Sequence, residues 1–348
     1  MHRLANIVAY ALLLCLAACT GAAQQALPSP TSALTNLTLP PGYTAVSIPV
    51  TLNRPTQMIN APNDRIWIAQ LNGGERDGTG QLLSVALEDG TAELLLSDLF
   101  KPTGIALLDG ALWIAAGRDI LRAPLDENGR PTKPEIVLSQ LPFNGRSNGT
   151  LTVSPDHTLI YETSGGNDPD SGKLWELDPA NPTQPRQLAS GLKGAYAHVF
   201  DENGRLWITE IGDGAVNGQQ PPEEINLVVP GADFGWPGCY GYQEAALNRG
   251  GTAALCAQTR APVVLFSPQS TPTSIAISPW QPDTLLVALW IDKMVMRVSY
   301  ELEGDNARGT AVPFITGFAA PQHLLVLPDQ SLLVSDHADG TLYRITQP

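Results

Sequence analysis

Six short apolar segments recur along the chain at nearly equal intervals, each just behind an acidic or turn-forming residue. The intervals between their central residues are 46, 47, 47, 79 and 47 residues. A period in the forties, with one strand-turn-strand pattern per repeat, is typical of the four-stranded blade of a β-propeller. The sequence therefore predicts an all-β fold, a six-bladed β-propeller. The central residues are Trp67, Trp113, Ile160, Trp207, Leu286 and Leu333.

The repeats are apolar without interruption, as in Leu112-Trp-Ile114 and Leu206-Trp-Ile208. Continuous apolar runs are expected of strands that are buried on both faces. A single blade cannot cover its own faces, so blades stack side by side and the ring closes to remove exposed edges. The interval of 79 residues exceeds one period by about 32. It predicts an insertion at about residues 213–262.

Composition agrees with a turn-rich β domain, because 348 residues with 43% hydrophobic content include 32 Gly and 30 Pro. The formal net charge of −14 argues against nucleic acid or an anionic membrane surface as a partner, since both require a basic patch. It is compatible with calcium. We expect a monomer that acts on a small molecule.

The N-terminus has the pattern of a secretion signal over residues 1–19. Arg3 precedes an apolar stretch that is too short to span a membrane and ends in small residues. Leu16-Ala-Ala-Cys19 looks like a bacterial lipobox, which would make Cys19 the lipid-modified first residue of the mature protein. Cleavage of a plain signal peptide nearby is the alternative. We expect an exported bacterial protein, lipid-anchored at the cell envelope or periplasmic.

The segment after the signal, residues 20–40, is rich in Ala, Gln, Pro, Ser and Thr and predicts a flexible tether. Residues 41–348 then form one propeller domain. Two cysteines remain in the mature chain, Cys239 and Cys256, 17 residues apart. In an exported protein such a pair is most simply a disulfide that closes the insertion.

Two polar segments lie where a propeller is expected to place the loops around the mouth of its channel. Residues 143–150 carry Arg146 and Asn148, which would stand at the start of an inner strand. Residues 162–170 carry Asp168, which has the carboxylate chemistry of a calcium ligand without the full ligand set of an EF-hand loop. An ordinary turn is the favoured explanation of both segments.

A third segment is more specific. It reads Thr209-Glu-Ile-Gly-Asp213, then Glu223-Glu-Ile-Asn226, then Asp233-Phe-Gly-Trp-Pro237. This series resembles the signature of the glucose/sorbosone dehydrogenase family, and its Pro-Pro-Glu-Glu-Ile-Asn form and Cys-Tyr-Gly ending resemble the sorbosone-like branch. The resemblance extends over about residues 41–346.

The resemblance implies a six-bladed propeller that oxidises a sugar or aldehyde with pyrroloquinoline quinone (PQQ) and calcium. The cofactor would carry the redox chemistry while the protein binds and orients it. Backbone carbonyls of the turn at Gly212 and Asp213 would hold one calcium ion. The region of Glu223 and Glu224 would supply a second, structural calcium site.

The chain departs from the family pattern at the positions that matter most. Arg146 stands where the family has its catalytic histidine, and arginine stays protonated near neutral pH. Asp168 lies two places beyond the expected Gly-Asp pair. Lys193-Gly194 replaces an Arg-Asn pair. Ala320 and Gln322 replace arginines that would bind the carboxylates of PQQ.

Three functions are therefore compatible with the sequence. In a PQQ dehydrogenase with a remodelled pocket, Arg146, Asn148 and Asp168 are the catalytic candidates, and the cofactor-binding residues are Lys193, Lys293, Gln322 and His323. The second possibility is a binding or interaction lipoprotein without that chemistry. The third is a calcium-dependent lactonase-like hydrolase. Its inner metal ligands would be Glu210, Asn148 and Asp336.

Overall fold

The structure is a computed structural model that describes residues 36–74, 77–143, 148–164, 170–212 and 214–347. All of these residues belong to one compact unit, Ser32–Pro348. No helix in this described part of the chain has the length and apolarity that crossing a membrane would require. Arg146, Asp168, Asp213 and Cys19, which the sequence nominates as functional, lie outside the described residues.

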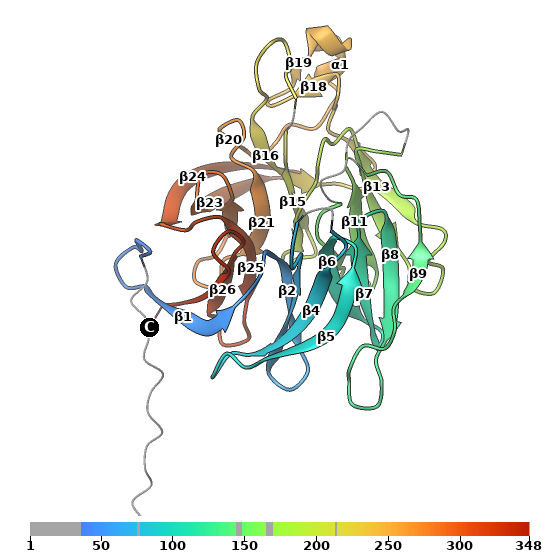
Figure 1. Ribbon diagram of the computed structural model, residues 1–348. Helices are drawn as coiled ribbons and strands as arrows, with labels where there is room; N and C mark the ends of the chain where they lie inside the picture. The colour runs from blue at the N-terminus through green and yellow to red at the C-terminus, as the bar shows by residue number, and fades with distance from the viewer. Residues whose placement is uncertain (1–35, 75–76, 144–147, 165–169, 213, 348) are drawn as a thin grey trace, which may run out of the picture. The chain divides into compact units, whose positions relative to one another are not determined.

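Six sheets, each with four antiparallel strands, form the blades of a β-propeller (Figure 1), which confirms the predicted fold. The sheet of blade 3 carries a fifth strand that pairs parallel with its outermost strand. Blade 1 contains β2 (Pro55–Ala61), β3 (Arg65–Gln70), β4 (Gly80–Ala86) and β5 (Ala92–Leu99). Blade 2 contains β6 (Pro102–Leu108), β7 (Ala111–Ala116), β8 (Asp119–Pro124) and β9 (Glu135–Leu138). Blade 3 contains β10 (Thr152–Val153), β11 (Leu159–Thr163), β12 (Lys173–Leu177) and β13 (Arg186–Ser190).

The second half of the ring repeats this plan. Blade 4 contains β14 (His198–Phe200), β15 (Leu206–Glu210), β16 (Glu223–Val228) and β20 (Val264–Phe266). Blade 5 contains β21 (Pro272–Ile277), β22 (Thr284–Leu289), β23 (Met294–Glu303) and β24 (Asn306–Thr316). Blade 6 contains β25 (Pro321–Val326), β26 (Leu332–Asp336), β27 (Thr341–Thr346) and β1 (Thr44–Thr51).

The last blade is built from both ends of the propeller domain. β1 pairs antiparallel with β27, in a register that runs from Thr44 opposite Thr346 to Thr51 opposite Thr341. The first strand of the domain therefore completes the sheet that the last three strands begin. This pairing supplies the ladder hydrogen bonds that an open edge would leave unmade.

The six repeats of the sequence are the second strands of the blades: β3, β7, β11, β15, β22 and β26. Their central residues are buried, with Trp113 and Trp207 fully enclosed between neighbouring sheets. The acidic residue before a repeat belongs to the preceding hairpin turn. Asp109 and Gly110 both have positive φ, 49° and 68°, which matches the two-residue turn that joins twisted strands most easily.

The first strand of each blade lies nearest the axis, and side chains tie these innermost strands together. The amide of Gln57 on β2 is the central tie. Its Nε2 donates to the Leu151 carbonyl at 2.8 Å, and its Oε1 accepts from Ile105 N at 2.7 Å and from Leu151 N at 3.0 Å. One buried side chain thus connects blades 1, 2 and 3.

The connection from β16 to β20 leaves blade 4, and its first strand pairs parallel with β13 of the neighbouring blade 3. It carries β17 (Ala232–Asp233), β18 (Cys239–Tyr240), β19 (Glu244–Ala245), the 3-10 helix η1 (Leu247–Arg249) and α1 (Ala253–Cys256). In Figure 1 its labels stand above β16 and β20.

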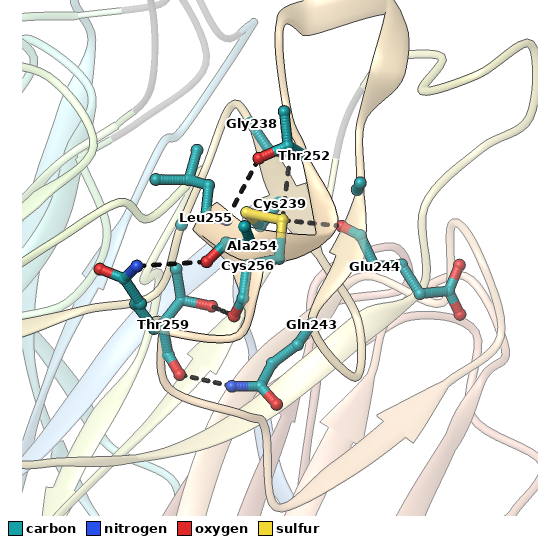
Figure 2. Close-up of a disulfide and its surroundings, with 12 residues drawn as sticks. Gly238, Cys239, Gln243, Glu244, Thr252, Ala254, Leu255, Cys256 and Thr259 are labelled. Atoms are coloured by element: carbon teal, nitrogen blue, oxygen red, sulfur yellow. Dashed lines mark hydrogen bonds between the residues drawn. A yellow bond between two sulfur atoms is a disulfide. The ribbon is translucent and has the colours of Figure 1, made fainter.

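The predicted disulfide joins Cys239 to Cys256 in this connection, with the Cα atoms 5.5 Å apart (Figure 2). The Thr252 hydroxyl caps α1 by accepting from Leu255 N at 3.2 Å. Gln243 Nε2 donates to the Thr259 carbonyl at 2.6 Å. The disulfide and these bonds hold together a segment that has little regular structure of its own.

We expect Gln57→Leu to lower the free energy of unfolding by about 2–4 kcal/mol, because it leaves two buried N–H groups and one carbonyl without partners. Urea denaturation of the variant and the wild type measures the difference. The matched control is Gln187→Leu on the exposed face of β13, where a surface change is expected to stay within about 0.5 kcal/mol. Equal losses in the two variants would contradict the role given to Gln57.

Candidate active site at one mouth of the propeller

A cavity of about 330 Å³ opens at the end of the propeller where the innermost strands begin. Five of the six blades contribute one polar side chain each, from the start of the innermost strand or just before it. Because the blades repeat around the axis, equivalent positions converge on one point. These five residues are Thr56, Thr103, Tyr196, Thr273 and Gln322.

The residues of this ring share a sequence signal that is separate from the apolar repeats. Four innermost strands begin with proline, and the next residue is the ring residue, as in Pro55-Thr56 and Pro321-Gln322. Proline suits the first position of a strand because it has no N–H to donate to the ladder. The recurring Pro-Thr or Pro-Gln pair, 11 to 14 residues before four of the six repeat centres, is the sequence signal of this pocket.

Two ammonium groups line the cavity, those of Lys101 and Lys193. Lys101 is buried, and its Nζ lies 5.6 Å from the centre of the Phe143 ring. Lys193 is half-buried, and its backbone N–H donates to Glu210 Oε1 at 2.7 Å. The described part of the pocket therefore has positive charge from two different blade connections.

An aromatic pair forms another part of the lining. The rings of Trp290 and His337 lie with their centres 6.1 Å apart, edge to face. His337 Nδ1 lies 2.9 Å from the Pro55 carbonyl oxygen, which can only accept, so Nδ1 carries a hydrogen. This bond and the contact with Trp290 fix the orientation of the imidazole.

Glu162, at the end of β11, is the only carboxylate among the described residues that line the cavity. It is 1% exposed, and Ser164 Oγ donates to its Oε1 at 2.8 Å. Burial raises the pKa of this carboxyl to about 7, while hydrogen bonds from Ser164 and the Ala195 backbone and the charge of Lys193 act in the opposite direction.

A second group of carboxylates lies next to the cavity, beyond Lys193. Glu210 on β15 stands directly opposite Glu224 on β16. Asn226 Nδ2 bridges them, donating to Glu210 Oε2 at 3.0 Å and to Glu224 Oε2 at 3.1 Å. Burial raises both pKa values, that of Glu224 to about 7, and the neighbouring charge of Glu224 raises that of Glu210 further.

The adjacent glutamates expected to share a calcium site point to opposite sides of β16, because successive side chains of a strand alternate. Glu224 joins Glu210 and Asn226. Glu223 Oε2 instead accepts from Gly212 N at 2.8 Å, and burial raises the pKa of Glu223 to about 8. Among the described residues, no three His, Cys, Asp or Glu side chains gather as a metal site.

The group formed by Glu210, Glu224 and Asn226 nevertheless offers the type of ligand atom that calcium binds. Glu210, Glu224 and Asn226 offer oxygen atoms only, which calcium prefers. Asn226 Oδ1 is fully buried and has no hydrogen-bond partner. Asn226 directs its Nδ2 at both carboxylates in this structure. A cation between the carboxylates would be met by the Asn226 Oδ1 once the amide is turned over.

Two of the predicted cofactor-binding residues lie elsewhere. Lys293 is exposed in the turn between β22 and β23, whereas Trp290 of the same turn lines the cavity. His323 follows Gln322 by one residue and belongs to a separate cavity at the other end of the channel. Its Nδ1 accepts from Met58 N at 3.4 Å, and burial lowers its pKa to about 3. The prediction placed both in the pocket because sequence spacing does not show side-chain direction.

The remaining predicted residues have mixed outcomes. Lys193 and Gln322 do line the cavity, and Gln322 Nε2 donates to Tyr196 Oη at 3.0 Å. Asn148 is buried with its Nδ2 donating to the Gly117 carbonyl at 3.0 Å. Asp336 accepts from the backbone of Ala319 and Ala320 at 2.7 and 2.9 Å, so its carboxylate supports the loop between β24 and β25.

These features define a class: a six-bladed β-propeller with a polar, partly aromatic pocket at the mouth of its channel. Within that class, residues 170–310 match the family model described as Glucose / Sorbosone dehydrogenase. This match covers part of the chain and supports the resemblance that the sequence motifs indicated. No curated protein sequence matches it.

Solved structures share the fold at low sequence identity. A putative oxidoreductase (glucose dehydrogenase) from Thermus thermophilus is 18% identical with a TM-score of 0.71, covering 88% of this chain and 100% of that one. The PQQ-bound aldose sugar dehydrogenase of Streptomyces coelicolor is 18% identical with a TM-score of 0.68, covering 88% and 99%. The calcium structure of an AA12-family enzyme from Trichoderma reesei is 15% identical with a TM-score of 0.74, covering 91% and 98%.

We expect the protein to lose stability as the pH rises from 5 to 8. Carboxyls whose folded pKa is raised favour folding below their unfolded pKa, and that contribution disappears as the pH rises through the folded value. The pKa of Glu223, raised from 4.5 to about 8, contributes to this loss, and one pKa unit corresponds to about 1.4 kcal/mol. Thermal melting across this range measures the slope.

Glu223→Gln is expected to flatten that slope, because a neutral amide does not titrate. The control is Glu135→Gln, an exposed carboxylate of β9, which is expected to leave the slope unchanged. A wild-type melting temperature that rises between pH 5 and 8 would contradict the assignment of raised pKa values.

Proposed function

We propose that the protein is an exported dehydrogenase that oxidises an aldose or a related sugar or aldehyde with PQQ as the electron acceptor. The observation that carries the proposal is the mouth cavity, where the ammonium groups of Lys101 and Lys193 occur together with the Trp290 and His337 rings. A planar tricarboxylate requires positive charge for its carboxylates and an aromatic face for its ring system.

In this chain, lysines would bind the carboxylates of PQQ in place of the arginines that the family resemblance led us to expect. Ala320 and Gln322 stand at those positions, which removes bidentate carboxylate recognition. Lysines at 101 and 193 supply charge without that fixed geometry. Arg146, also in the sequence segment before blade 3, would add a third cation. When bound, PQQ supplies a two-electron acceptor for a hydride.

The chain's own residues would bind and orient the substrate. The hydroxyls of Thr56, Thr103 and Thr273 both donate and accept hydrogen bonds, as a sugar with many hydroxyl groups requires. Gln322 and Tyr196, already joined by a hydrogen bond, present a further donor and acceptor from fixed positions. Such a ring favours a small polyhydroxylated molecule over an extended polymer.

Calcium binding is part of the proposal. Glu210, Glu224 and Asn226 would hold a calcium ion through oxygen atoms, and the turn at Gly212 and Asp213 remains the expected position of the ion nearest the quinone. A bound cation would offset the repulsion between the facing carboxylates. Glu224→Gln should therefore abolish a calcium-dependent rise in melting temperature.

Export and lipid anchoring at Cys19 complete the proposal, with a monomeric propeller joined to the envelope by residues 20–40. The test is fractionation of cells that express the full chain. Cys19→Ala should release the protein from the membrane fraction, whereas a protein with a plain cleaved signal would be released in both forms.

A binding protein without redox chemistry is the second candidate. The observation in its favour is that Arg146 stands at the position of the family's catalytic histidine, while Gln322 replaces an arginine. Such a protein would bind a sugar or an anion and turn over neither. The hydrolase alternative receives less support, because the Asp336 carboxylate accepts hydrogen bonds from backbone groups. Of its three expected ligands, Asn148 keeps a buried Oδ1 that has no hydrogen-bond partner.

We expect Lys193→Ala to weaken PQQ binding about 10- to 100-fold, since a hydrogen bond to a charged group contributes about 1.5–3 kcal/mol and 1.4 kcal/mol corresponds to a factor of ten. Fluorescence titration of the calcium-loaded protein with PQQ measures the dissociation constant. Lys293→Ala, which removes an exposed lysine outside the cavity, is the matched control and should bind normally.

The same preparation is then assayed with aldoses and aldehydes and a redox dye. Absence of both PQQ binding and dye reduction in the wild type would overturn the dehydrogenase. Sugar binding without PQQ binding would establish the binding protein instead.

A further inference from the structure

Oxidation of a sugar hydroxyl requires a group in the pocket that accepts the hydroxyl proton. Among the described lining residues, Glu162 and His337 are the side chains with a proton-accepting form near neutral pH. Lys101 and Lys193 are cations there, and Arg146 stays protonated. No sequence motif predicts a role for Glu162.

The backbone around Glu162 is shaped to approach its carboxyl closely. Gly149 has a φ of +70°, and a Cβ at that position would lie 3.0 Å from Glu162 Oε1 and 2.3 Å from the Tyr196 carbonyl oxygen. Only glycine tolerates both the conformation and the contact. Gly149, which lies just before blade 3, therefore approaches the Glu162 carboxyl closely.

The groups that face Glu162 come from three elements. Ser164, beyond the end of β11, donates a hydrogen bond to it, and Lys193, in the connection between β13 and β14, contributes a positive charge. Glu210 on β15 interacts with it as a like charge. This combination of donors, a cation and a second carboxylate is one in which a carboxyl can change its protonation state during a reaction.

We propose that Glu162 is the catalytic base of the dehydrogenase, an inference that rests on the proposed function. The substrate O–H bond breaks, and its proton passes to the Glu162 carboxylate. The C–H bond on the same carbon breaks, and its hydrogen leaves as hydride with two electrons to the quinone-class oxidant. The substrate becomes a carbonyl compound, and the proton on Glu162 then passes to the reduced oxidant, so that the oxidant gains two electrons and two protons in all.

The experiment compares the full-length wild type with Glu162→Gln, Glu162→Asp and His337→Gln, all loaded with PQQ and calcium. Glu162→Gln should lower kcat about 10²- to 10⁴-fold, the range for loss of a general base, with an unchanged dissociation constant for PQQ. Glu162→Asp should recover part of the activity. His337→Gln changes the cavity lining and can lower the rate, but its kcat/KM should still rise with pH. Glu135→Gln is the control for an exposed carboxylate.

The pH profile gives a readout that a structural role would not move. Wild-type kcat/KM should rise with pH through a midpoint near 7, and Ser164→Ala should move the midpoint upward because it removes a bond that favours the carboxylate. Infrared difference spectra between about pH 5 and 9, recorded without PQQ, should show a titrating carboxyl that is absent in Glu162→Gln. The Ser164 variant keeps the test decisive if Glu162→Gln does not fold.

The possible outcomes distinguish the role of Glu162 from the dehydrogenase function on which it rests. Wild-type turnover with undiminished turnover in Glu162→Gln overturns the role of Glu162 and leaves the dehydrogenase standing. Turnover that is lost in His337→Gln and kept in Glu162→Gln assigns the base to His337. A wild type that neither binds PQQ nor oxidises any sugar overturns the proposed function, and the role of Glu162 with it.

Discussion

The structure depends on the pairing of β1 with β27, which joins the two ends of the domain. Without it, blade 6 would keep three strands and an open edge, and the ring would lose the closure that lets six small sheets bury each other's faces. Closure also fixes the innermost strands in one circle. Side chains that begin those strands, such as Thr56 and Gln322, converge only because the circle is complete.

The candidate site contains several buried carboxyl groups, although a protein interior normally excludes charged side chains. Glu162, Glu210, Glu223 and Glu224 are buried, and burial raises the pKa of each. A buried carboxyl stabilises a fold poorly unless it is protonated, paired or bound to a cation. Four such groups on blades 3 and 4 concentrate this cost in one region, as expected where a structure serves chemistry rather than stability alone.

The architecture could be predicted from the sequence because repetition reports packing directly. Trp113 and Trp207 recur at the blade period since every blade needs a buried second strand, and the Cys239–Cys256 disulfide followed from spacing and export. The site was less predictable. His323 and Lys293 were misplaced because direction depends on strand alternation and turn geometry, and Glu162 was missed because one glutamate at a strand end gives no signal until neighbouring elements enclose it.

Strand β2 lines two different cavities with successive residues. Thr56 lines the mouth cavity and Gln57 lines the cavity at the other end, and no described residue lines both. A molecule at the mouth and one at the opposite end would therefore contact different side chains. A substitution at Thr56 would change the first surface and leave the contacts of the second in place.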